Sequence, residues 1–241
     1  MLRIIIMMLS LFFTITVYVA SIFIPFNGIT AAEIMNRLPI LFTPASYVLA
    51  IWVFIYILLG GWIYNFWRTQ DNYSKLVLNI RTILFTFISF LNSIMIYSLH
   101  YELFNLEFVV MSAVLLLTAA LYFTYPKREN RLCDRVPISV VFGCSFISLI
   151  ELTNYLLTFH EWSGWGLSNS LWAVIYLTVS TAIALHFMYH YRDIAFNAVF
   201  IWVFIGIAVK NGFDELFVST AALFLTLVIG ASFYLLKPSQ K

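Results

Sequence analysis

The chain has 241 residues, of which 63% are hydrophobic and 19% aromatic, and only 10% are charged, with a formal net charge of +2. Soluble domains have about 45–50% apolar and about 25% charged residues, so this composition excludes a soluble globular protein, and its low charge excludes a disordered chain. Two cysteines exclude a disulfide-rich scaffold, and the near-neutral charge gives no electrostatic basis for binding nucleic acid.

Eight apolar runs are long enough to cross a bilayer, which takes about 20 helical residues. In chain order they are residues 3–24, 46–67, 77–99, 107–125, 136–158, 169–190, 194–210 and 215–236. The first run is longer than the apolar region of a signal peptide, so we expect it to remain as a helix. The sequence therefore predicts an all-α integral membrane protein with about eight transmembrane helices.

Lysine and arginine residues are distributed very unevenly between the two sides of this map. All of them fall on one side except Arg37 and Lys210. Because cytoplasmic loops are rich in lysine and arginine, we expect both termini in the cytoplasm. The same rule places the loop 25–43 outside the cell.

The longest connection, residues 25–43, leads into the most distinctive segment of the chain. Asn27–Gly28 is a turn signal, and residues 31–38 are predicted to form a short amphipathic helix. Thr43 and Pro44 are predicted to start the second span, as N-cap and first helical residue. Trp52 and Tyr56 are four residues apart, which places both rings on one face of that helix.

The spacing of Pro44, Trp52, Tyr56 and Gly60 resembles the second helix of the tryptophan-rich sensory protein family (TspO/MBR). The mitochondrial translocator protein, or peripheral benzodiazepine receptor, belongs to that family. Stretches such as Arg192–Ala195 are similar to an elongated bacterial branch of it. The resemblance implies a five-helix core over residues 1–158, in which the loop 25–43 covers a ligand cavity. Residues 159–241 would form a C-terminal extension of three helices.

The resemblance also implies a function and a set of ligand-binding residues. The ligand would be hydrophobic and planar or sterol-like, such as a porphyrin or another tetrapyrrole, and the role sensory or transport in a bacterial inner membrane. Trp52 and Tyr56 would stack on the ligand, while Ala50 and Ile51 would shape the wall. Pro44 would fix the hinge of the covering loop. Three further residues are predicted to bind the ligand: Tyr47 from the same segment, and Asn92 and Glu151 from later spans.

The sequence departs from the compact family members between residues 68 and 161, where it contains no tryptophan. In those members, tryptophans of the third to fifth helices line the pocket. At such places this chain has Met95, Tyr97, Phe142 and Cys144.

Glu151 is a carboxyl group within the fifth span, where a charge is costly and is expected to face the bundle interior. Asn154 follows it, and Asn92 and His100 lie in the outer half of the third span. These residues predict either a polar anchor or proton relay in an outward-facing cavity, or a protonated glutamate with a structural role. The sequence leaves both interpretations open.

A second candidate site, for a metal ion, has weaker support in the sequence. His186, His190 and Asp193 are spaced to share one helical face, but no glutamate completes a zinc-binding HExxH motif. We therefore expect interfacial anchoring there and no metal or other cofactor. Phosphate-binding and nucleophile motifs are also absent, so we expect no enzyme.

Three functions remain from the sequence. The first is a ligand-binding membrane receptor or transport protein, whose partners would be the lipid bilayer and a hydrophobic small molecule. The second is a secondary transporter that uses Glu151 as its coupling group. The third is a non-catalytic assembly or signalling protein. A second copy of the chain, forming a homodimer, is a candidate partner.

Overall fold

The structure is a computed structural model that describes residues 1–24, 26–126 and 132–235. The cations Lys127, Arg128, Arg131, Lys237 and Lys241, which contribute to the predicted orientation, lie outside the described residues. Over the described ranges the regular structure is helical, and eight helices are long and apolar enough to cross a membrane. The predicted all-α fold with eight spans is therefore confirmed.

The helices follow the predicted spans closely. The eight long ones are α1 (Leu2–Phe23), α3 (Ile51–Thr69), α4 (Lys75–His100), α5 (Phe104–Phe123), α6 (Arg135–Phe159), α7 (Asn169–Tyr191), α8 (Ile194–Asn211) and α9 (Leu216–Leu235). A short helix, α2 (Ala31–Asn36), lies in the connection between the first two spans. We call residues 26–43 of this connection the lid.

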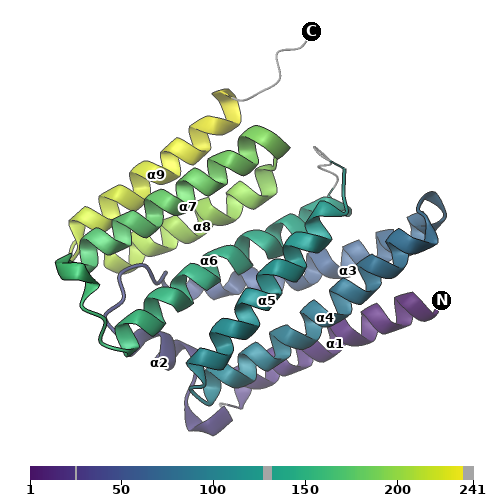
Figure 1. Cartoon of the computed structure of the whole chain (residues 1–241), viewed down its shortest axis with the longest axis horizontal. Helices are drawn as coiled ribbons and strands as arrows, with labels where there is room; N and C mark the ends of the chain where they lie inside the picture. Colours follow the sequence, from purple (N-terminus) through teal and green to yellow (C-terminus); the bar gives the residue numbers. More distant parts are fainter. Residues whose placement is uncertain (25, 127–131, 236–241) are drawn as a thin grey trace.

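The long helices form two groups (Figure 1). Helices α1, α3, α4, α5 and α6 make one bundle, in which α4 packs between α1 and α5 and α5 packs on α6. Helices α7, α8 and α9 make the second group, which contacts the first where α8 packs on α6. The N-terminus and the α3–α4 connection lie at one end of the bundle and α2 at the other, as the alternation of spans requires (Figure 1).

The contact between α6 and α8 is close because a glycine lies in it. A Cβ atom added to Gly143 of α6 would be 3.3 Å from the Phe196 carbonyl oxygen of α8. Phenylalanine pairs extend this contact along both helices, with the ring centroids of Phe142 and Phe196 5.3 Å apart. Small residues at such a crossing let two membrane helices pack backbone to backbone.

The predicted short helix of the lid is confirmed as α2, and its start is well defined. The Thr30 hydroxyl accepts a hydrogen bond from the Glu33 backbone N–H, and Glu33 accepts one in return from the Thr30 backbone N–H. This reciprocal capping box satisfies N–H groups that a helix start leaves free. The hydrogen bonds that the Glu33 carboxylate accepts from the Thr30 backbone N–H and hydroxyl lower the pKa of this carboxyl group.

The second span begins at Ser46, as its predicted bounds require, but the predicted cap at Thr43 and first helical residue at Pro44 are wrong. Thr43 does not cap a helix but lies buried beside the Glu151 carboxyl group. The chain is still extended at Ala45, and the span opens with a 3₁₀ helix over Ser46–Ala50 before α3 begins. The physical reason is a contact distant in sequence, since the Ala45 N–H donates to the Gly206 carbonyl oxygen of α8 at 3.1 Å.

We expect Gly206→Ala to destabilise the protein. A Cβ atom at this position would collide with the Val48 side chain and lie 3.1 Å from the Pro44 Cβ atom. Overpacking of this kind costs about 1–3 kcal/mol. The thermal unfolding midpoint, followed by tryptophan fluorescence in one detergent, should fall by roughly 2–12 °C.

Gly230→Ala is the matched control, because an added Cβ atom there meets nothing within 4 Å. Alanine is favoured over glycine inside a helix by roughly 0.5–1 kcal/mol, so this variant should be as stable as the wild type or more so. Equal midpoints for Gly206→Ala and Gly230→Ala would contradict the close contact between α8 and the start of the second span.

Candidate functional site

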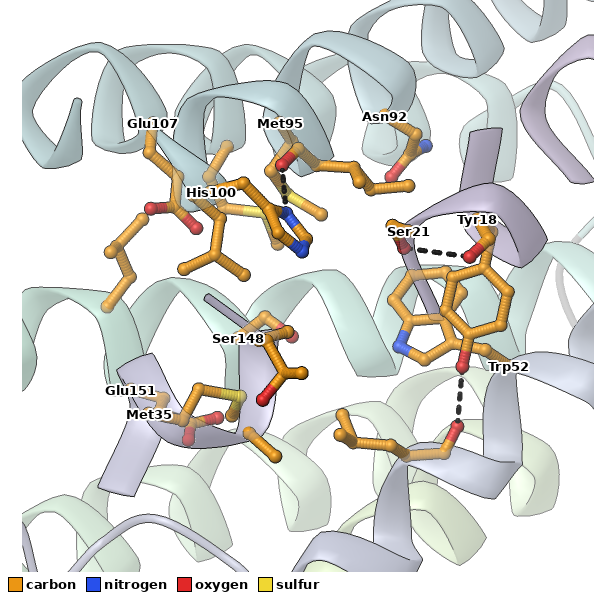
Figure 2. Close-up of a pocket in the computed structure, with 18 of the residues that line it drawn as sticks. Tyr18, Ser21, Met35, Trp52, Asn92, Met95, His100, Glu107, Ser148 and Glu151 are labelled. Carbon is orange, nitrogen blue, oxygen red and sulfur yellow. Dashed lines mark hydrogen bonds between the residues drawn. The ribbon is translucent and has the colours of Figure 1, made fainter. Parts of the chain in front are cut away.

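A cavity of about 430 Å³ lies within the first bundle, under the lid. Its lining comes from α1, the lid with α2, the start of the second span, α3, α4, α5 and α6. Figure 2 shows side chains from these elements surrounding a common space. Ligand cavities for small molecules have volumes of about 300–1,000 Å³, so this one is of ligand size.

Aromatic side chains form one end of the cavity. The rings of Trp52 and Tyr56 on α3 lie 6.2 Å apart between centroids, tilted by 36°. Tyr18 of α1 packs edge-on against Tyr56 at 5.4 Å, and its hydroxyl donates to the Leu49 carbonyl oxygen at 3.4 Å. These contacts hold a set of flat, apolar surfaces at one end of the cavity (Figure 2).

Titratable side chains lie toward the other end. His100 is at the end of α4, Glu107 in the first turn of α5 and Glu151 on α6. All three line the cavity (Figure 2), and each has a buried side-chain atom without a hydrogen-bond partner. Polar atoms in this state are rare in proteins, because a buried and unpaired polar group costs about 1–3 kcal/mol.

The lid is attached to the bundle by an ion pair and a hydrogen bond. Both guanidinium Nη atoms of Arg37 donate to the Glu102 carboxylate at 2.9 Å, a bidentate arrangement. The Tyr155 hydroxyl donates to the Ile34 carbonyl oxygen of α2 at 3.1 Å. The lid is thus fixed across the mouth of the cavity by contacts with the α4–α5 connection and with α6.

We expect the Arg37–Glu102 ion pair to fail in acid. The hydrogen bonds from Arg37 lower the pKa of the Glu102 carboxyl group from 4.5. A group whose pKa is lowered on folding contributes stability above its unfolded pKa and loses it as the pH falls through the folded one. The arginine stays charged throughout this range, so Glu102 alone determines the pH dependence.

Hydrogen exchange of the lid amides in wild type and Arg37→Gln tests this. The ratio of variant to wild-type exchange rates, which cancels the intrinsic effect of pH, should exceed one at about pH 7 and fall toward one as the pH is lowered through the folded-state pKa of Glu102, which lies below its ordinary value. Because both side chains are partly exposed to solvent, the difference at neutral pH should also shrink in high salt. A ratio that is constant with pH would show that another contact holds the lid.

The structure brings together four of the eight residues predicted to bind ligand. Trp52, Tyr56, Asn92 and Glu151 all line the cavity, and Asn92 also donates from its side-chain amide to the Ile88 carbonyl oxygen. Met95, one of the residues expected where compact members have tryptophan, lines it as well.

The structure places the other four predicted residues outside the lining. Pro44 contacts the region of Gly206, and the Tyr47 ring packs edge-on against Trp202 of α8 at 5.6 Å. Ala50 is exposed, and Ile51 packs against the core. The 3₁₀ helix explains the difference, because its tighter winding presents Leu49 to the cavity in their place.

Glu107 and Ser148 are among the lining residues that were not predicted. Glu107 is the first residue of the predicted fourth span, so its carboxyl group could be assigned to the membrane surface. In the structure it lies on α5 with only 7% of its surface exposed. An acidic residue inside a spanning segment is a signal of a functional site, and the position of Glu107 at the edge of its predicted span concealed that signal.

Of the face predicted for His186, His190 and Asp193, only the two histidines lie together, with ring centroids 4.2 Å apart. Helix α7 ends at Tyr191, Arg192 has a left-handed backbone, and Asp193 caps the start of α8 instead. Its carboxylate is buried, accepting hydrogen bonds from Tyr122 and Ser139. No group of three or more metal-ligating residues occurs among the described residues.

A comparison with protein families gives one match. The model of a family described as TSPO-like protein matches residues 4–235, which is nearly the whole chain. No curated protein and no solved structure matches.

Proposed function

Because the chain belongs to the TSPO-like protein family, a family with membrane receptor or transporter-type roles, we propose that it binds a hydrophobic small molecule in the cavity under the lid. The observation that carries this proposal is the cavity itself. It has the volume of a ligand site, aromatic rings at one end and a few buried polar groups at the other. That combination is typical of sites that bury a small molecule and orient it.

The ligand class that we propose first is a planar or sterol-like molecule, such as a tetrapyrrole. It follows from the family resemblance and is supported by the Trp52 and Tyr56 rings, on which a flat molecule can stack. The proposed role is binding for sensing or transport and includes no chemical step.

Titration of the purified protein with protoporphyrin, read as quenching of tryptophan fluorescence, tests this. We expect saturable quenching in the wild type and binding weakened about tenfold in Trp52→Phe, since aromatic contacts contribute about 0.5–1.5 kcal/mol beyond buried area. Trp165→Phe is the control, because Trp165 is exposed and does not line the cavity. Saturable quenching that is unchanged by Trp52→Phe would refute the assigned site.

The proposal includes an orientation and a division of the chain. The lid would face outward from the inner membrane, with both termini in the cytoplasm, as the lysine and arginine distribution predicts. Residues 1–158 would form the ligand-binding core and residues 159–241 an extension that supports the lid. The last lining residue, Tyr155, falls inside the core so defined.

A second candidate function is secondary transport with Glu151 as the coupling group. It is favoured by the position of Glu151, which lines the cavity and has one carboxyl oxygen without a hydrogen-bond partner. The positive charge of Lys210 on α8 interacts electrostatically with the same carboxyl group. Proton-dependent uptake into vesicles should then be lost in Glu151→Gln. Uptake that survives this change would count against transport of this kind.

A further inference from the structure

Three buried side-chain atoms of residues that line the cavity have no hydrogen-bond partner, and each can act as an acceptor. Glu107 Oε2 and Glu151 Oε1 are carboxyl oxygens without a partner. His100 Nδ1 lies 2.8 Å from the Ile96 carbonyl oxygen, which can only accept, so the proton is on Nδ1. The unpartnered Nε2 atom of a neutral His100 is then an acceptor as well.

These acceptors are deeply buried and face the cavity. His100 is 1% exposed and Glu107 is 7% exposed. Figure 2 shows the His100 ring and the Glu107 carboxyl group reaching from α4 and α5 into the space that Glu151 faces from α6. Each acceptor therefore has lost water without gaining a protein donor, and a bound molecule with donor groups would restore the missing hydrogen bonds.

The charges around the cavity point the same way. Its described lining contains two carboxyl groups and no lysine or arginine. Lys210 of α8 lies outside this lining and is the cation that interacts with Glu151, whereas the group that interacts with Glu107 is Glu151 itself. A bound cation would favour the ionised form of these carboxyl groups and be attracted to it, whereas a bound anion would gain no such partner.

We propose that the ligand is an amphiphilic amine, with its apolar body against Trp52 and Tyr56 and its protonated amino group among Glu107, Glu151 and His100. A primary ammonium group offers three N–H donors and no acceptor, which matches a site made of acceptors. This inference rests on the proposed function and narrows its ligand class. It ranks an amine above protoporphyrin, which carries two carboxylates.

A series of three probes with one ring system tests the proposal: aminomethylanthracene, anthracenemethanol and anthracenecarboxylate. Binding to the full chain in nanodiscs of neutral phosphatidylcholine is measured by energy transfer from tryptophan to anthracene, with empty nanodiscs as the control for partition. We expect the amine to bind at least about tenfold more tightly than the carboxylate, with the alcohol between them.

Glu107→Gln and Glu151→Gln keep the size of each side chain and remove its charge. Each should weaken binding of the amine about tenfold and change binding of the alcohol much less. Glu161→Gln, at an exposed position outside the lining, is the matched control and should bind all three probes like the wild type.

Each outcome decides one of the two proposals. Equal affinity of the wild type for amine and carboxylate, or an amine preference that both glutamine variants retain, would overturn the amine proposal and leave a hydrophobic ligand site standing. If neither the three probes nor protoporphyrin binds, the proposed function itself fails.

Discussion

Replacing Asp193 with alanine is expected to destabilise the protein more than any other single change considered. The side chain is 1% exposed and accepts hydrogen bonds from the Tyr122 hydroxyl at 2.8 Å, the Ser139 hydroxyl at 2.7 Å and the Phe196 N–H at 3.0 Å. It also forms a buried ion pair with Arg135, at 3.7 Å between nitrogen and oxygen. One carboxylate thus joins α5, α6 and the start of α8.

Breaking a buried ion pair by removing one partner costs about 3–5 kcal/mol, because the remaining charge stays buried. We therefore expect the thermal unfolding midpoint of Asp193→Ala to fall by roughly 6–20 °C in the same detergent. Asp71→Ala, at an exposed position after α3, should leave it unchanged. A midpoint within about 2 °C of the wild type for Asp193→Ala would show that this network contributes little.

Filling the cavity is expected to abolish ligand binding with little loss of stability. Ser148 of α6 lines the cavity near its middle (Figure 2), and it is half-buried. In Ser148→Phe, an aromatic ring would occupy space that the ligand needs. Affinity for any ligand of the cavity, whether protoporphyrin or an anthracene probe, should fall at least about 30-fold, which corresponds to about 2 kcal/mol.

The control for this variant is Thr220→Phe, which adds a similar ring at an exposed position of α9, away from the cavity. It should bind like the wild type, which separates loss of space from a general effect of added apolar surface. Full affinity in Ser148→Phe would place the ligand somewhere other than this cavity.

The eight spans were predictable because each is a local property of the chain. A helix in lipid satisfies its own backbone hydrogen bonds, so twenty apolar residues are enough to specify it. The capping box that starts α2 is local as well, since Thr30 and Glu33 are three residues apart. The start of the second span was not predictable in the same way. It depends on Gly206, 161 residues further along from Ala45, whose carbonyl oxygen takes the place of a helical partner.

The candidate site was predictable in part for the same reason. The spacing of Trp52 and Tyr56 identifies one helix face, and the cost of a carboxyl group in lipid identifies Glu151 as inward-facing. Nothing local indicates that His100 and Glu107 lie across the cavity from Glu151, because α4, α5 and α6 bring them together through packing. The pairing of Arg37 with Glu102 depends on the same tertiary arrangement.

The contacts of α8 with the lid have a consequence for how the chain can be divided. The Asn211 side-chain amide donates to the Leu41 carbonyl oxygen of the lid at 2.9 Å. The Gly206 carbonyl oxygen accepts a hydrogen bond from the Ala45 N–H, just before the start of the second span. Every described lining residue precedes Phe159, so a chain cut there would keep the whole inner surface of the cavity. The shortened chain would lose the hydrogen bonds by which α8 holds Leu41 of the lid and Ala45. The cavity is complete in composition within five spans, but two segments that border it are also held in place by α8.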